Sequence, residues 1–133
     1  RGFFNSINSY PPNDFLRSVS DSFILGEVKN GAGKAKPYFI FEAENYERAY
    51  AGMLSWEPEM IAGISNFYDP NEYSVSFEDK VIKNKDVRAL INRNTGEIVF
   101  LYTFLDAKTI VIVADEKSLE TITNAFLLAK RVQ

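Results

Sequence analysis

The feature that most constrains the fold is a series of strand-like segments in the second half of the chain. Each segment is short, alternates apolar and polar residues or is rich in β-branched and aromatic residues, and ends at a turn signal. Asn94-Thr95-Gly96 and Asp106-Ala107 are the clearest of these turns. Because tight turns join antiparallel neighbours, the pattern predicts antiparallel pairing. The predicted strands are residues 77–84, 87–92, 97–105 and 108–114.

Two further strands are predicted around a glycine-rich turn in the first half. Residues 23–29 ("FILGEVK") and 37–43 ("PYFIFEA") are rich in aromatic and β-branched residues. Residues 30–34 ("NGAGK") between them have the composition of a hairpin loop. The alternative interpretation is a phosphate-binding loop, since these residues end in Gly-Lys.

The phosphate-binding motif does not fit this loop. It requires G-x-x-x-x-G-K-[ST] followed by a helix, whose N-terminus faces the phosphates. Here Val28 stands five positions before Gly33, Ala35 follows Lys34, and the next segment is a strand. We therefore interpret the loop as a hairpin tip with solvated lysines, and we expect no nucleotide or other cofactor.

Helices are predicted near both ends of the chain. A short helix of about two turns has Asn13 or Asp14 as its cap, with Phe15, Leu16 and Val19 at helical spacing. A longer helix covers the C-terminal segment from about Ser118 to Arg131.

The central helix begins after Asn45, which is a favourable N-cap residue. Pro58 is predicted to end or kink this helix, because the residue before a proline is pushed out of the helical region. A second short helix then follows. The inward residues of the first part are Tyr46, Ala49, Tyr50 and Met53, and those of the second are Met60, Ile61, Ile64 and Phe67.

These elements predict a single α+β domain over residues 1–133, with a mostly antiparallel sheet of five or six strands and helices packed on it. The two halves also resemble each other, because residues 23–54 and 98–127 both read as a hairpin followed by a helix. Two explanations are open. The halves form an internal ββα repeat, or they share only the polar caps and apolar stripes of any strand-to-helix junction.

Composition removes several classes of function. The chain has 133 residues, no cysteine, no histidine and a net charge of −3. Disulfides, thiolate and histidine metal sites, and histidine-based triads are therefore excluded, and the acidic balance argues against nucleic acid as a partner. No apolar run reaches the length of a membrane helix, and no signal-peptide pattern is present. Because the chain begins at Arg1, we expect it to be a piece of a longer protein.

Carboxylates are the best catalytic candidates that remain. Glu42 and Glu44 lie at a strand-to-helix junction, where capping is the simpler explanation. Glu57 falls on the apolar stripe of the central helix beside Trp56, an environment that suits a general acid. If Pro58 ends the helix, Glu57 instead caps the next one. Catalysis by Glu57 with Glu42 or Glu44 requires the carboxyl groups to converge in a cleft.

Candidate binding residues come from apolar positions outside a helix's apolar arc and from aromatic residues. On the C-terminal helix, Leu127 and Leu128 fall outside the apolar arc, so either this helix is covered on a second side or they belong to a contact surface. The mixed charges of residues 77–93 indicate a solvated sheet face, with a ligand groove as the second interpretation. The aromatic candidates for a contact surface are Tyr38, Tyr46, Tyr50, Trp56 and Tyr73.

Two stretches carry a family resemblance, "NYERAYAGMLSWE" and "FEDKVIKNKDVRAL". From about Phe23 to its C-terminus, the chain resembles the C-terminal domain of uncharacterised single-pass membrane proteins of candidate-phylum (ultra-small) bacteria. The resemblance implies a membrane anchor and linker upstream, contact with the membrane only through that absent segment, and an extracytoplasmic terminal domain. It implies no activity and no site residues.

Together these observations favour a non-enzymatic binding or assembly module of an envelope-anchored protein, with a protein or another envelope component as its partner. The first alternative is a carboxylate-dependent hydrolase that acts on a glycan. The second is a structural spacer domain, which predicts no pocket and no exposed apolar patch.

Overall fold

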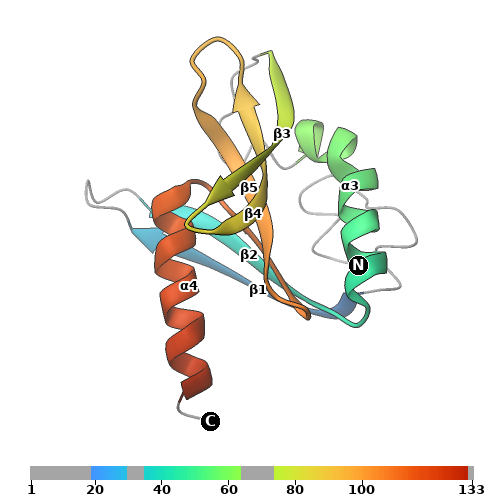
Figure 1. Cartoon of the computed structure of the whole chain (residues 1–133), viewed down its shortest axis with the longest axis vertical. Helices are drawn as coiled ribbons and strands as arrows, with labels where there is room; N and C mark the ends of the chain where they lie inside the picture. The colour runs from blue at the N-terminus through green and yellow to red at the C-terminus, as the bar shows by residue number, and fades with distance from the viewer. Residues whose placement is uncertain (1–18, 30–34, 64–73, 132–133) are drawn as a thin grey trace.

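The computed structural model describes residues 19–29, 35–63 and 74–131, which form one six-stranded antiparallel sheet and two helices (Figure 1). This confirms the predicted α+β fold and its antiparallel sheet. The strands follow the order β1-β2-β6-β5-β4-β3 across the sheet. The elements are β1 (Val19–Lys29), β2 (Ala35–Ala43), α3 (Tyr46–Gly63), β3 (Val75–Ile82), β4 (Lys85–Asn92), β5 (Ile98–Asp106), β6 (Thr109–Val113) and α4 (Glu116–Arg131).

The connections explain how a helix comes to lie across the sheet. Strands β3 to β6 form a meander, and β6 pairs with β2, whose other neighbour is the edge strand β1. After β2 the chain must reach the opposite edge at β3, and α3 spans this distance over one face. The groove described below lies between α3 and the β3–β4 hairpin.

The core has two layers, one on each side of the sheet. Because side chains alternate along a strand, Phe39 and Phe41 of β2 point to one face and pack with Met53 and Trp56 of α3. On the other face, residues such as Val111 pack with apolar residues of α4. Figure 1 shows α3 and α4 on opposite sides of the strands. Neither described helix is long and apolar enough to cross a membrane.

Helix α3 continues through Pro58 as one element to Gly63, so the prediction of two separate helices is wrong. Proline removes the hydrogen bond to the carbonyl of Leu54, four residues earlier. Both Pro58 and Leu54 are exposed, so water can bind that carbonyl. Asn45 caps the helix as predicted, since its Oδ1 accepts a hydrogen bond of 2.9 Å from the Arg48 amide.

The inward face of α3 also differs from the predicted one. Ala49 and Met53 are fully buried, but Tyr46 and Tyr50 are 47% and 37% exposed. The buried arc continues through Trp56 and Met60, beyond the position where the sequence-based helix ended. This longer arc is rotated relative to the predicted stripe, which moves the two tyrosines to its edge.

Helix α4 begins at Glu116, two residues before the predicted start, and Asp115 is its cap. The Asp115 Oδ1 accepts a hydrogen bond of 2.8 Å from the Ser118 amide. Leu127 and Leu128 are 51% and 62% exposed, which favours the contact-surface alternative over burial. Figure 1 shows the C-terminal turns of α4 projecting beyond the strands.

Strand β1 starts at Val19, so this residue is extended rather than helical. The rest of the first predicted helix, the turn at 30–34, the inward residues Ile64 and Phe67, and Tyr73 lie outside the described residues. The internal ββα repeat stays a prediction.

Gly26 allows the Tyr38 ring of β2 to lie close against the backbone of β1. It is the cross-strand partner of Tyr38, and a Cβ added at Gly26 would lie 2.5 Å from the Tyr38 Cζ. We expect Gly26→Ala to lower the free energy of unfolding by up to about 1 kcal/mol, measured by urea denaturation, because the end of the half-buried Tyr38 side chain must move aside. In a Tyr38→Ala background the same change should cost almost nothing, because the clash is gone. Equal costs in both backgrounds would contradict this explanation.

Candidate ligand-binding groove

A cavity of about 680 Å³ lies between the N-terminal half of α3 and the β3–β4 hairpin. Strands β4 and β5 form its floor, and α3 forms one wall. The hairpin turns tightly at Lys83 and Asn84, whose φ angles of 54° and 63° are typical of a two-residue hairpin turn. The lining includes Tyr46 and Tyr50 of α3, Asp79 of β3, Arg88 of β4, and Tyr102 and Phe104 of β5.

The α3 wall is aromatic. Tyr46 and Tyr50 are four residues apart, so they lie on the same side of the helix. Their rings are nearly parallel, with an interplanar angle of 9° and centroids 6.1 Å apart. Phe104 meets both rings edge-on, with centroid distances of 4.6 Å to Tyr46 and 6.1 Å to Tyr50. The partly exposed rings are thus held in place by a third ring from the sheet.

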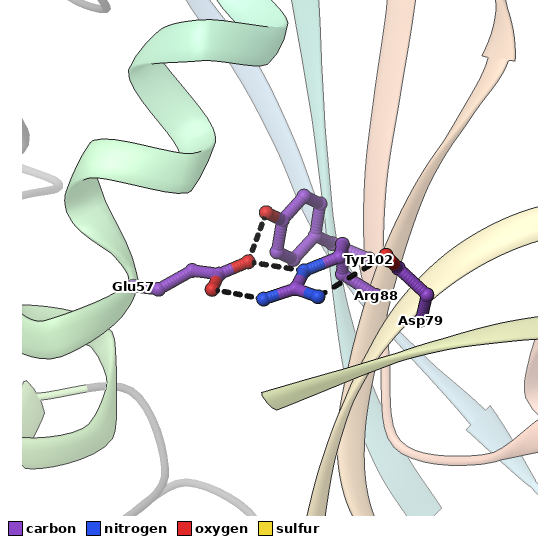
Figure 2. A network of polar contacts seen from close by, with 4 residues as sticks. All are labelled: Glu57, Asp79, Arg88 and Tyr102. Carbon is purple, nitrogen blue, oxygen red and sulfur yellow. Dashed lines mark hydrogen bonds and ion pairs between the residues drawn. The ribbon is translucent and has the colours of Figure 1, made fainter. Parts of the chain in front are cut away.

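Arg88 of the floor forms a largely buried ion pair with Glu57, which joins α3 to the sheet (Figure 2). The Arg88 Nε and Nη2 donate to the two carboxylate oxygens of Glu57 at 2.8 and 2.7 Å. The Tyr102 hydroxyl donates to the same carboxylate at 2.5 Å. Glu57 is only 8% exposed, so its charge is balanced by the guanidinium rather than by water.

Asp79 lies on the other side of the guanidinium from Glu57, as Figure 2 shows. The Arg88 Nη1 donates to the Asp79 Oδ1 at 3.1 Å, and the Asp79 side chain is 84% exposed. Arg88 therefore bridges one buried and one exposed carboxylate. The exposed Asp79 carboxylate lines the groove, and its hydrogen bond to Arg88 restricts its orientation.

The environment changes the pKa of three of these groups. The hydrogen bonds to Glu57 raise the pKa of Arg88 further above its ordinary value, so the guanidinium stays charged. Burial, together with the hydrogen bond to Glu57, raises the pKa of Tyr102, whose hydroxyl therefore keeps its proton. Partial burial raises the pKa of Tyr50, and the negative charge of Asp79 raises it further. Tyr50 thus remains neutral beside the ionic groups.

The charges of the groove cancel when Glu57 is included. Asp79 and Asp86 balance Lys80 and Lys85, and Glu57, which pairs with Arg88 but does not line the cavity, balances the third positive charge. The Lys85 Nζ is 3.4 Å from the Phe104 carbonyl oxygen. The groove therefore combines an aromatic wall with hydrogen-bonding groups and no net charge.

The catalytic candidates do not converge. Glu42 and Glu44 are exposed, and Glu44 precedes α3, whereas Glu57 is eleven residues past Tyr46, the first residue of that helix. A helix rises about 1.5 Å per residue, so roughly 16 Å separates Glu57 from the start of α3. That distance exceeds the ~5–10 Å between paired catalytic carboxyl groups. Glu57 neither caps a helix nor lines the cavity.

The binding candidates fall into three groups. Tyr46 and Tyr50 line the groove. Trp56 is fully buried in the core on the α3 side and is thus a packing residue. Leu127 and Leu128 belong to α4, which packs on the opposite face of the sheet. Tyr38 is half-buried against the core on the α4 side, so the predicted aromatic surface is limited, among the described residues, to the two tyrosines of α3.

Sequence reasoning missed the partners of Glu57. Arg88 was assigned to a solvated face, although the period of two places it on the same face as Leu90, which is buried under α3. An arginine on the inward face of a strand and a glutamate on the inward face of a helix each require a charged partner. Considering these two requirements together could have suggested the pair.

The described residues hold no group of three acidic side chains placed to bind a metal ion. What the groove offers is hydrogen-bond donors and acceptors beside exposed aromatic rings. Compared with known proteins, the chain matches no protein-family model and no curated protein sequence.

Proposed function

We propose that this chain is a non-enzymatic binding module that takes its ligand in the groove between α3 and the β3–β4 hairpin. The observation that carries the proposal is the position of Tyr46 and Tyr50. Their rings are held by Phe104 yet remain partly exposed over a cavity. Aromatic rings that are already ordered lose little conformational entropy when a ligand binds.

The placement of Glu57 supports binding over hydrolysis. A general acid or a nucleophile must reach the substrate, but Glu57 does not line the groove and accepts hydrogen bonds from Arg88 and Tyr102. Its geometry suits the attachment of α3 to the sheet. The spacer alternative predicts no pocket, and the groove therefore also favours a binding function.

The location and the partner complete the proposal. An envelope-anchored protein with this chain as its exposed, extracytoplasmic domain would present the groove to a protein or another envelope component. This part rests on the sequence resemblance alone.

The test compares two tyrosine substitutions with a matched control on the same helix. Calorimetric titration with a panel of oligosaccharides and short synthetic peptides should identify a ligand for the unaltered chain. The double variant Tyr46→Ala/Tyr50→Ala should then bind at least about tenfold more weakly, because the stacking surface is lost. Leu54→Ala should bind normally, since Leu54 is exposed on α3 but does not line the cavity.

Two results would contradict the proposed function. The first is that no member of either panel binds the chain. The second is that a ligand binds the double variant as tightly as it binds the unaltered chain.

A further inference from the structure

We propose that the ligand of this groove is an uncharged saccharide, whose ring stacks on Tyr46 and Tyr50 while its hydroxyls bond to Asp79 and Arg88. This inference rests on the proposed binding function and names the chemical class of the ligand.

The aromatic wall matches one face of a sugar ring. A pyranose presents C–H groups on its flat faces and hydroxyls around its edge. The rings of Tyr46 and Tyr50 are nearly parallel, line the cavity and are partly exposed, so they offer apolar surface to such a face, and Phe104 contacts both rings.

Asp79 and Arg88 match the edge of a sugar ring. The Asp79 Oδ1 accepts from Arg88, and its other carboxylate oxygen has no hydrogen-bond partner among the described residues. Arg88 carries five N–H groups, of which three make the hydrogen bonds to Glu57 and Asp79. The pair thus presents an acceptor beside donors. Neighbouring hydroxyls, each of which donates and accepts, are complementary to that arrangement.

The charge balance selects against ionic ligands. An anion at Arg88 would have to compete with two carboxylates that already occupy the guanidinium, Glu57 and Asp79. A cation at Asp79 or Asp86 would meet Arg88, Lys80 and Lys85 in the same groove. A neutral ligand with many hydroxyls avoids both costs.

The edge strand beside the groove also disfavours an extended peptide. Peptides that bind a sheet usually add a strand to an open edge. The outer edge of β3 carries three exposed charged residues in succession, Glu78, Asp79 and Lys80, which is typical of an edge protected against strand addition.

The experiment is a calorimetric titration of the chain with tetrasaccharides that differ in charge. The neutral probes are chitotetraose, cellotetraose, maltotetraose and mannotetraose, and the charged ones are tetragalacturonate and the tetramer of glucosamine. A set of short synthetic peptides is titrated in parallel, each probe to about 10 mM because weak millimolar affinities must be detected. At least one neutral tetrasaccharide should bind, and neither charged one should bind more tightly.

The variants separate stacking from hydrogen bonding. Tyr50→Ala should weaken binding about tenfold, whereas Tyr50→Phe should stay within about threefold because the ring is kept. Asp79→Ala should weaken binding about tenfold through the loss of a charged acceptor. Leu54→Ala should leave the affinity unchanged. The folding of each variant is checked by its urea midpoint.

The outcomes distinguish this inference from the proposed function. Binding of peptides or of charged tetrasaccharides alone, weakened by Tyr50→Ala, would overturn the saccharide inference and leave the binding module intact. Binding of no probe would overturn both. Release of new reducing ends during the titration would overturn the non-enzymatic function, while the saccharide class would stand.

Discussion

Replacing Glu57 by alanine should lower the free energy of unfolding by about 3 kcal/mol, because it leaves the half-buried Arg88 with only the exposed Asp79 as its partner. Arg88 loses two hydrogen bonds of 2.7 and 2.8 Å, and the Tyr102 hydroxyl loses its acceptor. Since these bonds join α3 to β4 and β5, the change also removes the attachment of the helix beside the groove. Urea denaturation followed by circular dichroism measures the loss.

Asp79→Ala is the matched control, because Asp79 is a carboxylate partner of the same guanidinium. Its side chain is 84% exposed, so the loss should stay below about 1 kcal/mol. The double variant Glu57→Met/Arg88→Met should recover part of the stability lost in Glu57→Ala, since the only charge left without its partner is the exposed Asp79. A Glu57→Ala variant as stable as Asp79→Ala would show that the ion pair does not hold α3 on the sheet.

Replacing Trp56 by alanine should lower the free energy of unfolding by about 3–5 kcal/mol. Trp56 is fully buried between α3 and the sheet, so its removal leaves a large cavity in the core on this face. Trp56→Phe keeps an aromatic ring and should cost clearly less. Circular dichroism is the appropriate measurement, because Trp56 is the only tryptophan in the chain.

This second prediction also decides between two roles for Trp56. The sequence placed it among the binding candidates, whereas the structure places it in the core. A Trp56→Ala variant that kept full stability but lost ligand binding would contradict the burial of this residue.

The strands could be predicted from the sequence because their signals are local. The alternating segments and the turns at Asn94-Thr95-Gly96 and Asp106-Ala107 lie next to each other in the chain, and β4, β5 and β6 appear close to the expected positions. The cap of α3 at Asn45 is local for the same reason.

The predictions that failed depend on contacts distant in the sequence. Pro58 is a strong local signal for a helix end, but burial of Trp56 and Met60 on both sides of it keeps α3 continuous. Because the predicted helix ended before Met60, its inward face was defined by the residues of the first turns, which include Tyr46 and Tyr50. Only the full helix shows that these tyrosines lie at the edge of the core.

The residues that meet at the groove could not be predicted, because they come from four separate elements. Glu57 and Arg88 are 31 residues apart, and Tyr102 is 45 residues from Glu57. Pairing them requires knowledge that α3 crosses the sheet toward β3. The mixed charges of residues 77–93 did suggest a groove as a second interpretation, and the structure supports that alternative.

The most direct measurement of the central claim is a two-dimensional amide NMR titration of the unaltered chain with the neutral tetrasaccharides. We predict that the signals of residues lining the groove will shift. The largest changes should include those of Tyr46, Tyr50, Asp79 and Arg88. Absent shifts, or shifts centred on Leu127 and Leu128 of α4 across the sheet, would contradict it.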